Sequence, residues 1–265
     1  MHSAPRIVAI GSSAAAALAA SGGALRAIPG FADAPYRLAG TEIVWIGTRG
    51  EPHPRAVFLD QPLGEGRLAW DADHPAPARH GRTGPLARAA AAAHFGALAR
   101  NCRQLGQPRG CGCLLAGLAP PFPLSARAEA MHALAATIAG DDPAGLVAAG
   151  VRLLGVGGGL TPSGDDFVGA ALFTLAHLRS ARWRQAAAEL THVANERTHA
   201  ISAALFADLA RGESFAPLHD LLAAADASAM GEPAQRLVNI GHSSGWDMLT
   251  GMIAAATGTL HHSTH

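Results

Sequence analysis

The chain has 265 residues, of which 49% are hydrophobic and only 15% are charged, and its formal net charge is zero. This composition fits a globular protein of one large or two small domains and excludes an intrinsically disordered chain. The zero net charge and the lack of a basic cluster argue against a nucleic-acid partner. All 20 basic residues are arginine, which excludes a Schiff-base lysine and a P-loop lysine.

Residues 1–75 carry the signals of a β-rich N-terminal domain. Short apolar or β-branched runs between glycine, proline and aspartate turns predict strands at 7–10, 36–38, 42–46 and 56–59. Residues 6–20 loosely resemble an export signal, but the Gly11-Ser12-Ser13 interruption and the alanine content favour a strand, a turn and a helix. No uninterrupted apolar run reaches about 18 residues, so we expect no membrane partner.

The rest of the chain is predicted to be mainly helical. We place a proline- and glycine-rich linker at 76–85 and a larger helical domain at 86–265, which makes the fold class α+β. Helical periodicity predicts helices at 86–100, 125–139, 142–149, 164–179, 183–211 (one long helix or two in line), 214–225 and 244–256.

The stretch from Gly155 to Phe167 is the strongest functional signal in the sequence. It contains five glycines, two hydroxyl residues and two adjacent carboxylates, and an apolar helical pattern follows it. Backbone N–H groups at such a loop-to-helix junction can bind an anion, and the helix dipole helps. The alternative is a capped helix, with Thr161 or Ser163 as the cap. Capping explains one hydroxyl and one carboxylate, so we favour a functional loop.

A second segment repeats part of this pattern. Ser163-Gly164-Asp165-Asp166 and Ser244-Gly245-Trp246-Asp247 both read S-G-x-D before an apolar helix, and Gly241-His242-Ser243 precedes the second copy. If the two helix beginnings converge, their dipoles and N–H groups form one polar cradle. The alternative is two independent capping boxes.

A third pattern lies between these two segments. Thr191, Asn195, Thr198 and Ser202 fall on one stripe of the helix predicted at 183–211. This uncharged polar stripe indicates either one wall of a polar pocket or hydroxyls that bond to the carbonyls of their own helix. Periodicity alone does not separate the two interpretations.

The three cysteines do not follow a zinc-site pattern. Cys111 and Cys113 form a C-x-C pair, Cys102 lies nearby, and there is no second pair. We therefore interpret them as ordinary buried or loop cysteines.

Together the three polar motifs resemble the AllH-like (YlbF-like) family, typified by a subunit of oxamate carbamoyltransferase. The resemblance rests on the string from Gly157 to Asp166, on Thr198-x-x-Ile201-Ser202, and on Gly241 to Asp247. It implies a cytoplasmic protein of nitrogen or purine catabolism that works in a multi-subunit complex. The implied reaction converts oxamate and carbamoyl phosphate to oxalurate and phosphate.

The residues that we expect to form the site follow from these motifs. The catalytic candidates are Asp165, Asp166, His242 and Asp247. The substrate-binding candidates are Gly157, Gly158, Gly159, Thr161, Ser163, Gly164, Thr198, Ser202, Ser243 and Ser244. We expect a small anionic substrate and no cofactor, with Mg²⁺ as an option at Asp165 and Asp166. Two carboxylates beside an anion site repel the anion, so we predict that one aspartate caps and the other faces substrate or metal.

Two other function classes remain open. The chain is alternatively a non-catalytic ligand-binding or scaffolding subunit of a complex, which would bind its ligand without turnover. It is alternatively a metal-dependent hydrolase of an amide or ureido compound that uses the aspartates and His242.

Overall fold

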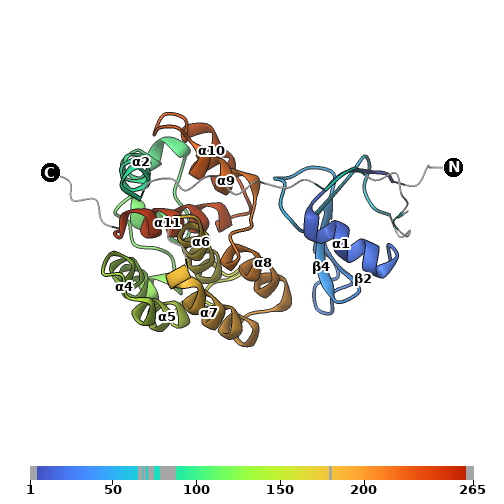
Figure 1. Ribbon diagram of the computed structural model, residues 1–265, viewed down its shortest axis with the longest axis horizontal. Helices are drawn as coiled ribbons and strands as arrows, with labels where there is room; N and C mark the ends of the chain where they lie inside the picture. The colour runs from blue at the N-terminus through green and yellow to red at the C-terminus, as the bar shows by residue number, and fades with distance from the viewer. Residues whose placement is uncertain are drawn as a thin grey trace. The chain divides into compact units, whose positions relative to one another are not determined.

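A computed structural model of the chain describes residues 5–64, 68, 70, 75–77, 88–178 and 181–260. The chain divides into an N-terminal unit, Met1–Gly81, and a helical unit, Arg82–His265. The first contains a five-stranded sheet and the second is built from helices (Figure 1). The predicted α+β class, with a larger helical part, is therefore confirmed.

The N-terminal unit is one mixed sheet with one helix. Its elements are β1 (Ile7–Ile10), α1 (Ser12–Ser21), β2 (Leu25–Ala27), β3 (Tyr36–Ala39), β4 (Glu42–Gly47) and β5 (Ala56–Leu59). The strand order is β1-β5-β4-β3-β2, and only β4 and β5 run parallel. The helix α1 buries Ala14 and Leu18 in the core of this unit. All four predicted strands and the predicted helix are present, and β2 is an addition.

The helical unit contains ten further α-helices among the described residues. They are α2 (Arg88–Arg100), α3 (Gly112–Leu115), α4 (Ala128–Ala139), α5 (Pro143–Val151), α6 (Ser163–Leu178), α7 (Arg184–Arg197), α8 (Ala200–Ala210), α9 (Ala216–Ala223), α10 (Gly231–Val238) and α11 (Ser244–Thr257). Short 3₁₀ segments lie at Cys102–Leu105, Leu124–Arg127 and Ala181–Trp183. The sequence did not predict α3 or α10.

The helices α6 and α11 form the centre of this unit (Figure 1). In α6 every residue from Ser163 to Leu175 is buried, and in α11 every residue from Gly245 to Ala256 is buried. The two helices approach so closely that a Cβ at Gly251 would overlap the carbonyl oxygen of Phe167. Small residues allow this contact, and apolar residues on all sides explain why both helices are enclosed.

The region predicted as one long helix or two in line at 183–211 forms two helices, α7 and α8, so the predicted polar stripe is not continuous. Thr198, with φ −123° and ψ 172°, and His199, with φ −85° and ψ 164°, are both extended and separate α7 from α8. The hydroxyl of Thr191 donates to the carbonyl of Ala187 (2.7 Å), and Asn195 is exposed. The four residues therefore do not line one helical wall, because helical periodicity ends at Thr198.

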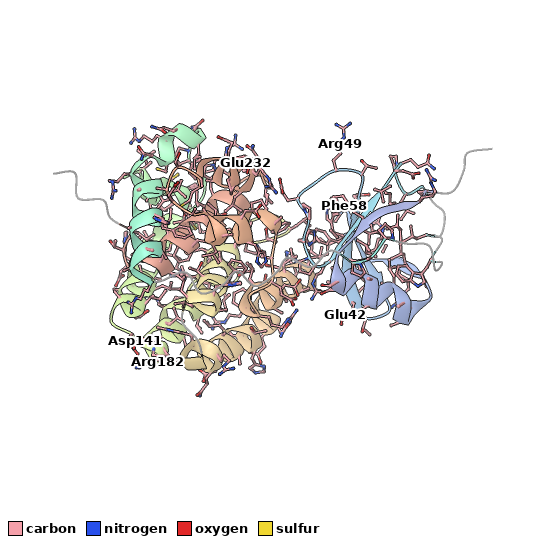
Figure 2. The ribbon with its side chains drawn as sticks, turned by 45° about the horizontal axis from the view of Figure 1, so that its top comes forward. Glu42, Arg49, Phe58, Asp141, Arg182 and Glu232 are labelled. Atoms are coloured by element: carbon pink, nitrogen blue, oxygen red, sulfur yellow. The ribbon has the colours of Figure 1, made fainter. Side chains whose placement is uncertain are left out.

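The beginning of α5 is an ordinary capped helix end. Asp142 is the N-cap residue, its Oδ1 accepts the N–H of Gly145 (3.0 Å), and Pro143 opens the helix. The neighbouring Asp141 forms an ion pair with Arg182 (3.0 Å) at the surface of the helical unit (Figure 2). At this helix beginning an aspartate and a proline therefore form a local cap, without any of the predicted site residues.

The predicted linker at 76–85 lies almost wholly outside the described residues, which include only 76 and 77 of it. Among the residues that the structure describes, no helix is both long and apolar enough to span a membrane.

Candidate functional site

The beginnings of α6 and α11 meet, and their hydroxyl side chains bond to one another. Thr161 Oγ1 lies 2.9 Å from Ser244 Oγ, and Ser163 Oγ lies 3.4 Å from Ser243 Oγ. We call these four residues the hydroxyl cluster. The two positive helix ends repel each other when adjacent, and buried carboxylates or a bound anion relieve that repulsion.

The capping interpretation does not hold for these hydroxyls. Thr161 donates instead to Asp166 Oδ2 (2.8 Å), and no side-chain hydrogen bond caps α11 at Ser243. The hydroxyls thus join two separate motifs rather than closing their own helix ends.

Asp165 secures the loop that leads into α6. It is 2% exposed, its Oδ1 accepts the N–H of Gly155 (2.6 Å), and its Oδ2 accepts the hydroxyl of Ser202 (2.6 Å). Both carboxylate oxygens are therefore engaged, one by the glycine loop and one by α8. This arrangement brings Ser202 to the site without the helical stripe that the sequence indicated.

Asp166 and Asp247 are buried near each other, one in the first turn of each helix. Burial first, and then the negative charge of Asp247, raise the pKa of Asp166 well above its usual value, although the hydroxyls of Thr161 and Ser244 offset part of this. Burial also raises the pKa of Asp247 to about 6. Two buried carboxyl groups that interact in this way disfavour the state in which both are charged.

One oxygen of Asp247 has no hydrogen-bond partner among the described residues. The side chain is fully buried, and its Oδ1 accepts the N–H of Cys111 (2.6 Å), but Oδ2 accepts no bond. The hydroxyls of Ser163 and Ser243 lie near enough to favour its charged form without reaching bonding geometry at Oδ2. A buried acceptor without a donor is rare and often marks a site.

The glycine loop presents an open face beside the hydroxyl cluster. Gly158 and Gly159 are exposed, and a Cβ at either would meet no atom within 4 Å. Gly157 faces the other way, since a Cβ there would lie 2.6 Å from the backbone nitrogen of Ser163. A small ligand can therefore approach the loop backbone closely from the side of Gly158 and Gly159.

The residues between α7 and α8 contact the glycine loop. His199 Nε2 lies 3.3 Å from the carbonyl oxygen of Gly159, and a Cβ at Gly155 would lie 2.7 Å from the carbonyl oxygen of Arg197. The buried Thr198 Oγ1 makes no hydrogen bond with the described residues, so none ties it to the hydroxyl cluster. The break between α7 and α8 thus lies against the loop.

The segment Arg109-Gly110-Cys111 lies against α11, and none of its residues was among the predicted site residues. Arg109 Nη1 donates to the carbonyl of His242 (3.2 Å) and lies 3.5 Å from His242 Nδ1, and both side chains are exposed. A Cβ at Gly110 would overlap Asp247 Oδ1. The glycines on both sides of Cys111 were the sequence signal for this close contact.

The metal expectation receives no support from the geometry. Among the described residues, no group of three or more histidine, cysteine, aspartate or glutamate side chains is arranged to hold a metal ion. Both oxygens of Asp165 already accept hydrogen bonds, so Asp165 and Asp166 do not form a ready carboxylate pair for Mg²⁺. The Mg²⁺ option stays a prediction.

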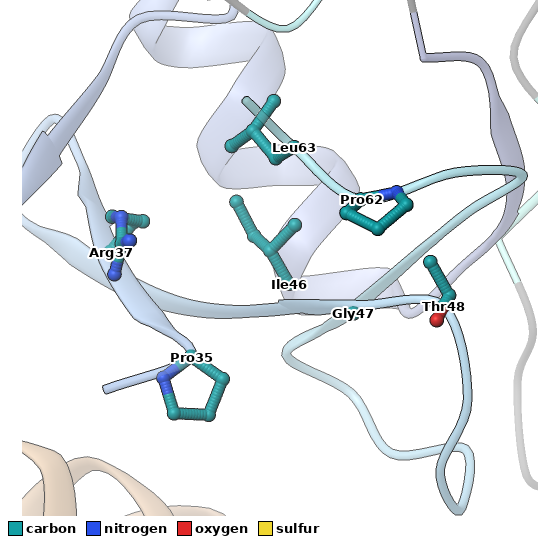
Figure 3. A pocket seen from close by; sticks show the side chains of 7 residues that line it. All are labelled: Pro35, Arg37, Ile46, Gly47, Thr48, Pro62 and Leu63. Atoms are coloured by element: carbon teal, nitrogen blue, oxygen red, sulfur yellow. The ribbon is translucent and has the colours of Figure 1, made fainter. Parts of the chain in front are cut away.

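A hollow of about 250 Å³ lies in the N-terminal unit (Figure 3). It is lined by Pro35, Arg37, Ile46, Gly47, Thr48, Pro62 and Leu63. Its one charged side chain, Arg37, donates to the backbone carbonyls of Ala34 and Tyr36. None of the predicted site residues lines it.

Comparison with known protein families finds a match that lies within the helical unit. Residues 153–256 match the family model described as "Oxamate carbamoyltransferase subunit AllH". The match contains the glycine loop, the hydroxyl cluster and all three site aspartates, and it confirms the AllH-like resemblance for this region. No curated protein and no solved structure matches the chain.

Proposed function

Since residues 153–256 match the AllH family, we propose that this chain is a subunit of a carbamoyltransferase-type enzyme. The proposed reaction joins the carbamoyl group of carbamoyl phosphate to the nitrogen of oxamate, which yields oxalurate and phosphate. We further propose that the chain acts in the cytoplasm, with other subunits, in nitrogen or purine catabolism.

The main support for the proposal is that the beginnings of α6 and α11 contact each other through hydroxyl side chains. The bonds from Thr161 to Ser244 (2.9 Å) and from Ser163 to Ser243 (3.4 Å) bring two positive helix ends to one point. A point with hydroxyl donors and positive helix dipoles favours a small anion. The fully buried Asp247 Oδ2, which has no hydrogen-bond partner among the described residues, would add an acceptor for a substrate N–H.

The reaction needs donors where negative charge develops and an acceptor for one proton. The amide nitrogen of oxamate forms a bond to the carbonyl carbon of carbamoyl phosphate, and the bond from that carbon to the phosphate oxygen breaks. The loop from Gly157 to Gly159 and the hydroxyl cluster would donate to the carbonyl oxygen and the leaving phosphate. Asp166 or Asp247 would take the proton from nitrogen, and the exposed His242 would pass it to solvent.

The raised pKa values of the two aspartates would reduce the repulsion between their carboxyl groups and an anionic substrate. Burial and the charge of Asp247 raise the pKa of Asp166, and burial raises that of Asp247, so the state in which both carboxyl groups are charged is disfavoured. A shared proton also allows the pair to act as acid and base in turn. Asp165, whose oxygens hold Gly155 and Ser202, would position the loop instead of contacting substrate. We assign no step to a metal.

The test is ligand binding by the purified chain with one hydroxyl removed. We expect carbamoyl phosphate, phosphate, oxamate or oxalurate to stabilise the chain, by roughly 2.7 kcal/mol at 100 times the dissociation constant. Thr161→Val should weaken binding roughly tenfold in calorimetry, because it removes the hydroxyl that joins Asp166 to Ser244 and holds the two helix beginnings together. A hydrogen bond to a charged group contributes about 1.5 kcal/mol or more.

Thr174→Val is the matched control. Its hydroxyl is buried on α6 and donates to the carbonyl of Ala170 (2.9 Å), away from the helix beginning, so binding should be unchanged. Equal losses in both variants would refute this location of the site. Binding without phosphate release, when the chain is assayed alone and with its co-purifying subunits, would favour a ligand-binding or scaffolding subunit. Loss of turnover on chelation would favour the metal-dependent hydrolase.

A further inference from the structure

We infer that Arg109 binds the oxyanion of the small substrate and so selects charged over neutral amides. This inference rests on the proposed function and adds a specificity-determining residue to the same site. Arg109 lies outside residues 153–256, so the family match does not include it.

The position of Arg109 places a positive charge at the beginning of α11. Its Nη1 is 3.2 Å from the carbonyl oxygen of His242 and 3.5 Å from His242 Nδ1. His242 directly precedes Ser243, which belongs to the hydroxyl cluster. Its side chain is exposed, and none of the ion pairs among the described residues includes it. The guanidinium therefore keeps donors available for a ligand, and its planar fork matches a carboxylate or a phosphate.

The residues that follow Arg109 are fixed to both motif helices. The N–H of Cys111 donates to Asp247 Oδ1 on α11 (2.6 Å), and Cys111 Sγ lies 3.8 Å from the carbonyl oxygen of Ser163 on α6. Gly110 and Gly112 allow the contact, because side chains there would overlap Asp247 and the ring of Trp246. The backbone that carries Arg109 is thus held in place before any ligand arrives, which lowers the entropic cost of binding.

An independent feature indicates which ligand chemistry suits this position. Asp247 Oδ2 is buried, has no partner among the described residues and belongs to the carboxylate that Cys111 holds. An acceptor on the carboxylate that is bound by Cys111, two residues after the Arg109 cation, fits a molecule that carries both an N–H donor and an oxyanion. Oxamate has both groups, and carbamoyl phosphate has both as well, whereas the neutral diamide oxamide has only the donor.

The experiment compares oxamate, oxamide and inorganic phosphate as calorimetric probes of the full-length chain. We expect Arg109→Gln to weaken binding of oxamate, phosphate or both by roughly tenfold or more, since a charge-assisted bond is lost. Binding of oxamide should change less than about twofold, because no charged contact is removed. Arg109→Lys should restore only part of the affinity, because lysine lacks the planar fork.

Arg103→Gln is the matched control, since Arg103 is an equally exposed arginine whose Nη2 donates to the carbonyl of Ala116 (2.8 Å). It removes the same charge from the same part of the chain and should leave binding of all three probes unchanged. A loss confined to oxamate assigns Arg109 to the carboxylate, and a loss confined to phosphate assigns it to the phosphoryl group. Unchanged binding in Arg109→Gln, or an equal loss in Arg103→Gln, overturns the inference alone. If the unmodified chain binds no probe, the proposed function fails with it.

Discussion

Aspartates have different roles at two kinds of helix beginning, that of α5 and those of α6 and α11. At α5 the exposed Asp142 accepts an N–H of its own helix, Gly145, and the bond is local and satisfied. At α6 and α11 the aspartates are buried and accept donors from distant segments, as Asp165 does from Gly155 and Asp247 from Cys111.

The difference between these helix ends shows when an aspartate at a helix beginning signals a site. A cap lowers the energy of one helix and needs no neighbour. A buried aspartate without a counter-charge raises the energy of the fold unless other segments or a ligand supply donors. The first of three predictions tests the helix packing that buries these aspartates, and the next two test the aspartates themselves. They are given from the largest expected effect to the smallest.

Gly251→Ala should separate α11 from α6 and destabilise the helical unit by more than about 3 kcal/mol. The added Cβ would overlap the carbonyl oxygen of Phe167, and backbone cannot move aside as a side chain can. Urea unfolding followed by far-ultraviolet circular dichroism measures the loss. Gly231→Ala is the control, because its Cβ would meet no atom within 4 Å, and we expect no loss there. Similar curves for the two variants would show that the close approach of α6 and α11 is not required.

The stability of the chain should fall as pH rises through the titration of Asp247. Its pKa rises from 3.8 in the unfolded chain to about 6 in the folded one, so the folded state binds the proton more tightly. This contribution is complete below about pH 4 and is lost as pH rises past 6, and it amounts to at most about 3 kcal/mol. Asp166, whose pKa is also raised, acts in the same direction.

Asp247→Asn should flatten this dependence, because its side chain is neutral at every pH. The measurement is urea unfolding of both proteins between about pH 4 and pH 7, where the two curves should diverge toward high pH. Parallel curves for the variant and the unmodified chain would contradict the prediction. A smaller slope should persist in the variant because Asp166 remains.

Asp165→Asn and Asp142→Asn make the same chemical change at the two kinds of helix end. Asp165→Asn should cost about 2 kcal/mol, because an amide cannot accept from both Gly155 N–H and Ser202 while remaining buried. Asp142→Asn should cost less than about 0.5 kcal/mol, because asparagine is an equally good N-cap residue. Urea unfolding at neutral pH gives both values. Equal losses would mean that Asp165 is only a cap.

Where the sequence predicted the fold, local signals were strong. Runs such as Glu42–Gly47 and Ala56–Leu59 alternate with clear turn residues, and Asp142-Pro143 marks the start of α5. The short edge strand Leu25–Ala27 was missed, because three residues show no periodicity. The helix from Gly231 to Val238 was also missed, since its eight residues contain a glycine and a proline.

At the candidate site the sequence indicated which residue types gather at the two helix beginnings, but it left most of their contacts open. The two S-G-x-D segments indicated paired helix ends, and the hydroxyls of Thr161 and Ser244 do meet. The predicted polar stripe ends at Thr198, because Thr198 and His199 are extended and interrupt the helix. Arg109 was missed, because nothing near it in the sequence resembles either motif.

By itself, the sequence determined the α+β class, most of the helices and strands, and the concentration of glycines, hydroxyls and aspartates in two segments. These properties follow from short-range preferences, which a chain carries in its local pattern. Only the tertiary structure decided that Asp165 holds the loop while Asp166 and Asp247 share a buried environment, and that Arg109 reaches the beginning of α11. Burial and long-range hydrogen bonds make those assignments, and both depend on which distant segments pack together.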